Sequence, residues 1–363
     1  MKLIGHLALA RILVFLISLV ALPAMAQEGP KLTDIIEAWL ASPHAERSDE
    51  AFVHWDEDGA IPESCATCHS GAGLRDFLGA DGSTVGKVDQ PAMLGTTVDC
   101  ATCHNKTAST LETVTFPSGA VASGLGSSAI CAVCHQGRQS TESVNSAIAG
   151  GEDDTVNGDL GFLNVHYRAA AATLMGDAAR GGYQYEGRTY VGQFTHAPTV
   201  NTCASCHNPH TTEVVVETCA TCHKDIDDPK AVRFLPIDYD ADGDITEGVH
   251  GEVTTLHAAL GAAINAYSTE VIGSGVVYDS NAYPYFFADS DGNGAVTEGE
   301  AIYPNRYQSW TPRLLKAAYN YQFVAKDPGG YTHNPKYVLQ LLYDSLDSIA
   351  AVTSVDTAAL VRP

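Results

Sequence analysis

The feature that most constrains this chain is the arrangement of its ten cysteines within 363 residues. The cysteines form five pairs, each with two residues between its members and a histidine directly after the second. The five motifs begin at Cys65, Cys100, Cys131, Cys203 and Cys219, and no cysteine is left over. Because residues i, i+3 and i+4 share one face of a helix, each motif can present two thiols and an imidazole on one side of a helical turn.

This spacing indicates covalent attachment of haem c. Disulfides need no histidine after each pair, zinc sites do not demand one at that position every time, and iron–sulfur clusters use cysteines alone. Histidine makes up 14 of 363 residues, so five chance placements in five would have odds of roughly one in ten million, which favours the haem motif. The two thiols would bond to one porphyrin, and the histidine would supply the proximal nitrogen to iron.

We therefore expect five haem c groups. The predicted attachment residues are Cys65, Cys68, Cys100, Cys103, Cys131, Cys134, Cys203, Cys206, Cys219 and Cys222. The predicted proximal ligands are His69, His104, His135, His207 and His223.

The second axial ligands are expected to be mainly histidines. Only Met93 and Met175 follow the predicted signal peptide, so methionine cannot serve most of the irons, and bis-histidine haems have low potentials. The best-placed candidates are His44, His54, His166, His196, His210 and His333. Six candidates for five positions leave three alternatives: one is a bystander, one haem is ligated by methionine, or one haem is open. His250 and His257 lie on a predicted helix and are interpreted as structural.

Among these candidates, His210 allows the most specific prediction. It lies three residues after the proximal His207. Two histidines this close cannot bind opposite faces of one haem, because the porphyrin plane would lie between them. We therefore expect His210 to serve a neighbouring haem.

The N-terminus is typical of a secretory signal peptide. Lys2 and Arg11 precede or flank an apolar run over residues 12–22, and Ala24-Met25-Ala26 is a small-x-small cleavage site. We expect cleavage after Ala26, a periplasmic or extracellular protein and no integral membrane segment. Loss of Lys2 and Arg11 takes the formal charge from −23 to −25. This acidity disfavours nucleic acid and anionic membranes as partners and leaves other redox proteins as the expected electron donor and acceptor.

Two segments match calcium-binding loops. Residues 289–300 fit the EF-hand pattern at every key position, with Asp289, Asp291, Asn293, Ala295, Thr297 and Glu300 as predicted ligands. A second loop offers Asp238, Asp240, Asp242 and Asp244, but its twelfth position is Val249. Glu247 or Glu252 could substitute there, and the alternative is an acidic surface turn.

The expected fold is mainly α with much irregular chain, and its core is packed by haem. We divide the chain into a signal peptide over 1–26, a pentahaem domain over 27–235 and a helical C-terminal region over 236–363 that packs on the haem domain. Helical spacing predicts helices over residues 32–40, 249–267, 312–323 and 337–349, whereas 105–129 and 149–160 are predicted to be loops.

The stretch from Cys203 to His210, CASCHNPH, resembles the doubled CxxCH motif of bacterial multihaem cytochromes c. Residues 42–45, 166–196, 310–312 and 327–334 resemble segments of the same group. This resemblance implies an electron carrier, a conductive filament, or a reductase of nitrogen or sulfur oxyanions. Pentahaem nitrite reductases carry their catalytic haem on CxxCK, whereas every motif here ends in histidine, which argues against that enzyme.

The function expected is electron transfer through five mostly bis-histidine haems. The alternative is a multihaem oxidoreductase of a small inorganic substrate, with one open haem. A filament or another oligomer is a variant of the first hypothesis.

Overall fold

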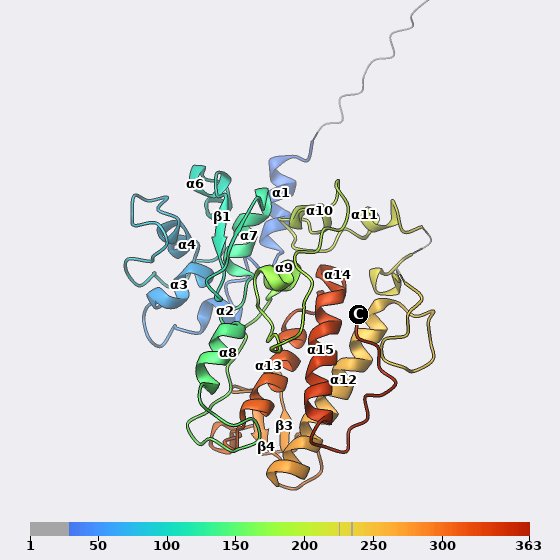
Figure 1. Cartoon of the computed structure of the whole chain (residues 1–363). Coiled ribbons are helices and arrows are strands. Elements are labelled where there is room, and N and C mark those ends of the chain that lie inside the picture. Colours follow the sequence, from blue (N-terminus) through green and yellow to red (C-terminus); the bar gives the residue numbers. More distant parts are fainter. Residues whose placement is uncertain (1–28, 225, 234) are drawn as a thin grey trace, which may run out of the picture.

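The computed structural model describes residues 29–224, 226–233 and 235–363, so the predicted signal peptide lies outside the described residues. The described chain is mainly helical with long irregular connections, as expected. Its upper part in Figure 1 contains short helices, and its lower part contains the three longest ones. Among the described residues, no helix is both long enough and apolar enough to cross a membrane.

The chain before residue 225 forms short helices, and five of them, α3, α5, α7, α10 and α11, carry the cysteine motifs. The short helices are α1 (Leu32–Leu40), α2 (Glu50–Val53), α3 (Glu63–His69), α4 (Gly71–Phe77), α5 (Cys100–Cys103), α6 (Lys106–Ser109), α7 (Ala129–Cys134), α8 (Thr141–Ile148), α9 (Ala170–Met175), α10 (Cys203–Cys206) and α11 (Val216–Ala220). Helices of one or two turns are unstable alone, because the conformational entropy lost in forming the first turn is compensated by only a few hydrogen bonds. Side-chain caps compensate in part; Asp99, for example, accepts a hydrogen bond from the Thr102 backbone N–H at 2.9 Å.

The lower part is built on α12 (Val249–Tyr267), α13 (Pro312–Lys326) and α15 (Pro335–Ala350), with α14 (Gly330–His333) leading into α15. Pro312 and Pro335 occupy the first helical turn, where a missing N–H costs nothing. On α15 the predicted apolar stripe of Val338, Leu341 and Leu342 is at most 1% exposed. The four helices predicted from spacing are therefore present, and α12 has the predicted bounds.

Two hydrophobic cores join the upper and lower parts. The first lies among α12, α13 and α15 and includes Leu160 from before residue 235. The second packs Ala169 and Ala172, from before residue 235, against Tyr319, Phe323 and Tyr337, from after it. Both cores therefore contain residues from either side of residue 235.

Polar side chains of the long helices also support the irregular chain that follows α8. Asn320 accepts from the Tyr183 N–H at 2.6 Å and donates to the Tyr183 carbonyl at 2.9 Å. Gln322 accepts from the Val165 N–H at 2.9 Å. Buried backbone groups outside regular structure require such partners. The long helices thereby hold the segment that carries His166 and His196.

Two short antiparallel hairpins complete the fold. β1 (Thr113–Thr115) pairs with β2 (Val121–Ser123), and β3 (Val276–Tyr278) pairs with β4 (Phe286–Ala288). The prediction of an unbroken loop over residues 105–129 was therefore wrong, since this stretch also contains α6 and the first hairpin. Strands of three residues are too short for an alternating pattern to be recognised.

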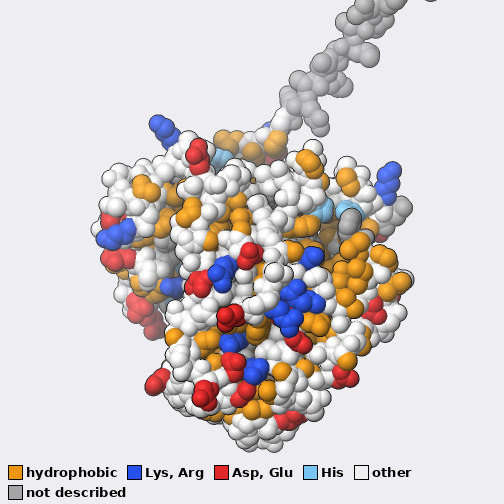
Figure 2. Space-filling model, in the orientation of Figure 1, with side chains coloured by type: hydrophobic (Ala, Val, Ile, Leu, Met, Phe, Trp, Pro, Cys, Tyr) orange, Lys and Arg blue, Asp and Glu red, His pale blue; other side chains and the backbone are white. Residues whose placement is uncertain are grey.

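The surface reflects this division of the molecule. On the face shown in Figure 2, acidic and basic side chains gather over α13 and α15 in the lower middle. At the upper right, below α10 and α11, histidine and hydrophobic side chains reach the surface together. This patch lies beside the helices that carry the fourth and fifth cysteine motifs.

Candidate functional site

The structure places each of the five motif histidines opposite a second histidine. The ring centroids are 5.7 Å apart for His69–His166, 6.2 Å for His104–His210, 6.3 Å for His135–His44, 6.3 Å for His207–His333 and 5.9 Å for His223–His196. The partners come from distant parts of the sequence; His69 and His166 are separated by 97 positions. Tertiary structure, rather than local sequence, therefore creates the pairs.

These separations fit a metal ion between the two rings. A metal–imidazole bond is about 2.0–2.1 Å long, so two nitrogens on opposite sides of one metal lie about 4 Å apart and the ring centroids about 6 Å apart. All five centroid distances lie close to that value. In the first pair the Nε2 atoms of His69 and His166 face each other at 3.5 Å.

In several of these rings, Nδ1, the nitrogen that points away from the paired histidine, contacts a backbone carbonyl. Nδ1 of His69 lies 2.7 Å from the Ala51 carbonyl, and Nδ1 of His135 lies 3.3 Å from the Arg168 carbonyl. When Nδ1–H donates to an oxygen, Nε2 carries the free lone pair that can bind a metal. These contacts therefore select the tautomer that iron ligation requires.

Burial keeps two of the paired imidazoles, His135 and His166, neutral. Desolvation lowers the pKa of His135 to about 4, with a smaller contribution from His44. Desolvation followed by the neighbouring His69 lowers the pKa of His166 to about 4 as well. Because only a neutral imidazole can bind a metal, both rings are ready to bind at physiological pH.

His333 differs from the other paired histidines because its outer nitrogen contacts a carboxylate. Nδ1 of His333 lies 2.9 Å from both carboxylate oxygens of Asp327, which is 4% exposed. No sequence pattern singles out Asp327, because a carboxylate six residues before a histidine is a common spacing.

The ring of the sixth candidate, His54, packs against Trp55 with centroids 4.9 Å apart, and Trp55 in turn packs against His69 at 5.1 Å. The His54 side chain is 60% exposed, and its Nδ1 contacts Glu50 at 2.7 Å. Met93 is 75% exposed, and Met175 lies in the second hydrophobic core. His257 stacks on Tyr321 and contacts its carbonyl at 2.8 Å, in keeping with a structural role.

The five motifs are contiguous in space. The Gly71 N–H bonds to the Thr97 carbonyl at 3.1 Å and joins the first motif to the second. The first and third motifs meet where Cys134 Sγ lies 3.7 Å from the Thr67 carbonyl. The third and fourth are joined by a hydrogen bond of 3.0 Å from the Cys203 N–H to Ser128 Oγ.

The fourth and fifth motifs are joined by the backbone bond of 2.7 Å from the Val215 N–H to the Cys206 carbonyl. All ten cysteines lie in the described part of the chain, and none of them forms a disulfide there. The thiols, imidazoles and exposed apolar side chains of this region are therefore consistent with covalently attached haem.

The loop over residues 289–300 gathers the oxygens that the EF-hand pattern predicted. Ligand oxygens of Asp289, Asp291 and Glu300 lie within 4.8 Å of one another. Glu300 is 5% exposed and accepts from the Ser290 and Thr297 N–H groups at 2.7 and 2.9 Å. The Thr297 and Ser290 contacts hold the pKa of the Glu300 carboxyl below its usual value despite its burial.

The remaining predicted positions of this loop surround the same cluster. Asn293 donates to Asp291 at 2.8 Å and accepts from the Ala295 N–H at 2.7 Å, and Thr297 Oγ1 lies 3.3 Å from Asp291. Gly294 has a φ of +76°, which a residue with a side chain rarely adopts, at the sharp turn of the loop. The side chains of the predicted ligand positions thus lie close to one another around this turn.

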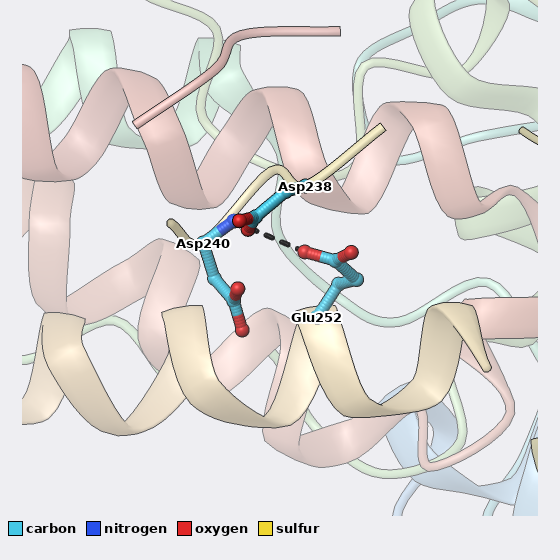
Figure 3. Close-up of side chains that lie close together, drawn as sticks. All are labelled: Asp238, Asp240 and Glu252. Atoms are coloured by element: carbon cyan, nitrogen blue, oxygen red, sulfur yellow. Dashed lines mark hydrogen bonds between the residues drawn. The ribbon is translucent and has the colours of Figure 1, made fainter. Parts of the chain in front are cut away.

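The second candidate loop also brings carboxylates together. Oxygens of Asp238, Asp240 and Glu252 form one group within 4.8 Å, and those of Asp240, Asp242 and Glu247 form another. Figure 3 shows the first group, in which Glu252 projects from α12 toward the backbone of the loop. Asp244 is exposed, and its carboxylate accepts from Thr246 at 2.6 Å.

No protein-family model matches the chain. The chain is 26% identical over 369 residues to the C-type polyheme cytochrome OmcB of Geobacter sulfurreducens, covering 82% of this chain and 45% of that protein. It is 29% identical over 225 residues to the C-type polyheme cytochrome OmcC of the same species, covering 53% of this chain and 27% of that protein. The chain therefore spans less than half the length of these relatives.

Among solved structures, the chain is similar to the outer cell wall cytochrome OcwA. The TM-score is 0.41 with 16% sequence identity, over 87% of this chain and 50% of that one. A superposition this loose carries no argument about function. The five CxxCH motifs and the similarity to polyhaem cytochromes together support a multihaem c-type cytochrome.

Proposed function

We propose that this protein transfers electrons through five haem c groups, each held between two histidines, in the periplasm or at the cell exterior. The proposal rests on the pairing of every motif histidine with a second histidine. In each pair the distance between ring centroids fits an iron ion between the two rings. Haem supplies the one-electron chemistry, and the protein sets its ligands, burial and hydrogen bonding.

The paired histidines would occupy both axial positions of each iron. The second ligands are then His166 for the first motif, His210 for the second, His44 for the third, His333 for the fourth and His196 for the fifth. Bis-histidine ligation without methionine favours low reduction potentials. His54 would have no part in ligation.

The contacts between motifs support a continuous route for electrons. Hydrogen bonds and side-chain contacts link the segments that carry neighbouring motifs, from the second to the first and on through the third and fourth to the fifth. His210 adds a further link, since it follows the fourth motif and faces His104 of the second. Redox proteins that act as donor and acceptor would then exchange electrons with haems at the surface of the motif region.

The loop over residues 289–300 is proposed to bind calcium in a structural role. Its clustered oxygens suit a hard cation that takes 6–8 oxygen ligands. The loop follows β4. The Asn305 side chain connects the two ends of the loop by donating to the Ala288 and Glu300 carbonyls at 2.8 and 3.0 Å. A bound ion would therefore brace the β3–β4 end of the lower part.

Carbon monoxide binding tests the electron-transfer proposal. Carbon monoxide needs an open position on a reduced haem, so the fully reduced protein should show no change in its Soret band under the gas. A matched His54→Ala variant should behave in the same way. Binding of one equivalent per chain would mean an open haem, and the oxidoreductase alternative would replace the proposal.

A further inference from the structure

The loop that runs from Asp238 to Glu247 lacks the usual closing ligand of an EF-hand. Its twelfth position is Val249, the first residue of α12. Two nearby glutamates, Glu247 and Glu252, have carboxylates within reach of the loop. Their surroundings distinguish the roles that each can play.

Glu252 already has partners for its charge and for its oxygens. It is completely buried, and Oε2 accepts from the Tyr239 and Asp240 N–H groups at 2.8 and 3.0 Å. Its other oxygen pairs with the guanidinium of Arg233. Arg233 also donates to the carbonyls of Leu235 and Glu247 at 3.0 and 2.8 Å. Glu252 and Arg233 together therefore anchor the two ends of the loop.

Three other carboxylate oxygens in the loop are buried and have no hydrogen-bond partner among the described residues. They are Asp238 Oδ1, Asp240 Oδ2 and Glu247 Oε1. Asp240 is only 8% exposed, and its carboxylate is shared by both oxygen groups. Buried polar atoms without partners are rare, because the free energy lost when they leave water is not compensated by a hydrogen bond. A cation among these oxygens would supply the missing partner.

Gly251 makes room for the Glu247 carboxylate. A Cβ atom at residue 251 would overlap Oε2 of Glu247, which folds back over the first turn of α12. Glycine is a poor residue inside a helix. Here its missing side chain is what allows Glu247 to turn toward the loop.

We propose that residues 238–247 bind a calcium ion through the side chains of Asp238, Asp240, Asp242 and Glu247, with Glu247 as the closing ligand. Glu252 stays outside the coordination sphere as the anchor held by Arg233. The oxygen-only ligand set and the flexible loop suit calcium better than magnesium, which demands near-octahedral geometry. This site is independent of the proposed electron transfer.

The loop connects separate parts of the chain. The Tyr239 carbonyl accepts from the Val361 N–H at 3.0 Å, and the Val232 carbonyl accepts from the Val249 N–H at 3.1 Å. A bound ion would thus hold together the connector, α12 and the C-terminal segment.

Calcium counting on the haem-loaded full chain tests the site. A Glu300→Gln background removes the closing ligand of the other loop, so that binding at residues 238–247 is observed alone. After chelation and equilibrium dialysis against calcium at millimolar concentration, the range of weak extracellular sites, elemental analysis should find one calcium per chain. A background protein without bound calcium would overturn the proposal.

Three further substitutions in that background identify the closing ligand. Glu247→Gln should weaken calcium binding by at least about tenfold, and Gly251→Ala should weaken it as well, because binding depends on ligand charge and position. Glu57→Gln is the matched control, since it makes the same chemical change at an exposed side chain outside the loop, and it should change affinity by less than about threefold.

The Glu252→Gln substitution tests whether Glu252 anchors the loop or binds the calcium ion. It should lower the melting temperature, because Arg233 loses its buried partner, while the chain still binds one calcium. Calcium should raise the melting temperature of the background protein but not that of Glu247→Gln, and an unchanged haem spectrum would show that each variant is folded. Wild-type affinity in Glu247→Gln, or lost binding in a folded Glu252→Gln, would overturn the assignment.

Discussion

Asp327 should lower the reduction potential of the haem bound between His207 and His333. Its carboxylate contacts the outer nitrogen of His333 at 2.9 Å and is 4% exposed. Burial alone would raise the pKa of Asp327, but the His333 ring and nearby donors lower it overall. The carboxylate is therefore charged at neutral pH, and its effect should be lost only as the pH falls through that lowered pKa.

The size of the effect follows from the geometry. The contact of 2.9 Å, the width of the imidazole and one metal–nitrogen bond place the charge about 7 Å from iron. At an effective dielectric constant of about 20, two unit charges at that distance interact with about 2.4 kcal/mol. Since about 2.3 kcal/mol corresponds to 100 mV for one charge, Asp327→Asn should raise the potential of this haem by roughly 100 mV. Asparagine can still accept the Nδ1–H bond, so the change isolates the charge.

A spectroelectrochemical titration of the haem-loaded protein measures this shift. Asp327→Asn should displace one component of the five-haem curve upward, whereas Asp327→Glu should leave it near its original place. Glu50→Gln is a matched control, because Glu50 also contacts a histidine Nδ1, at 2.7 Å, but that histidine is His54. A shift below about 20 mV, or an equal shift in the control, would refute the reasoning.

Three further predictions concern ligands, metal and core. His166→Ala should convert one haem to a high-spin form that binds carbon monoxide, whereas His54→Ala should leave the spectrum unchanged; the opposite pattern would reverse the ligand assignment. Glu300→Gln should remove one calcium per chain by elemental analysis, and an unchanged count would exclude the loop over residues 289–300. Trp310→Ala should lower the free energy of unfolding by about 3–5 kcal/mol in denaturant titration, because Trp310 is 1% exposed in the first core; a change below about 1 kcal/mol would contradict this packing.

The residues proposed to attach haem and their following histidines can be recognised in the sequence because covalent attachment imposes a strict local pattern. The order Cys-x-x-Cys-His fits one helical turn, so each attachment site and its proximal histidine are neighbours in sequence. The second histidines have no such constraint. His333 meets His207 only because α14 lies against α9, α12 and α15, and no local pattern encodes that contact. Sequence could therefore name the candidates but not their partners.

The same distinction between local pattern and tertiary contact applies to the helices, the shared core and the second acidic loop. The helices of the lower part were predictable because their apolar stripes follow the helical repeat. The shared core was not, since Ala172 and Phe323 come together only through tertiary packing. Likewise, the choice between Glu247 and Glu252 depends on Arg233, whose contacts appear only in the folded chain.

Low-temperature electron paramagnetic resonance of the oxidised protein, with iron counted per chain, tests the central claim most directly. The account predicts five irons, all low-spin and with the signature of two axial histidines. A high-spin haem in the unmodified protein, or fewer than five irons in a fully loaded preparation, would contradict it.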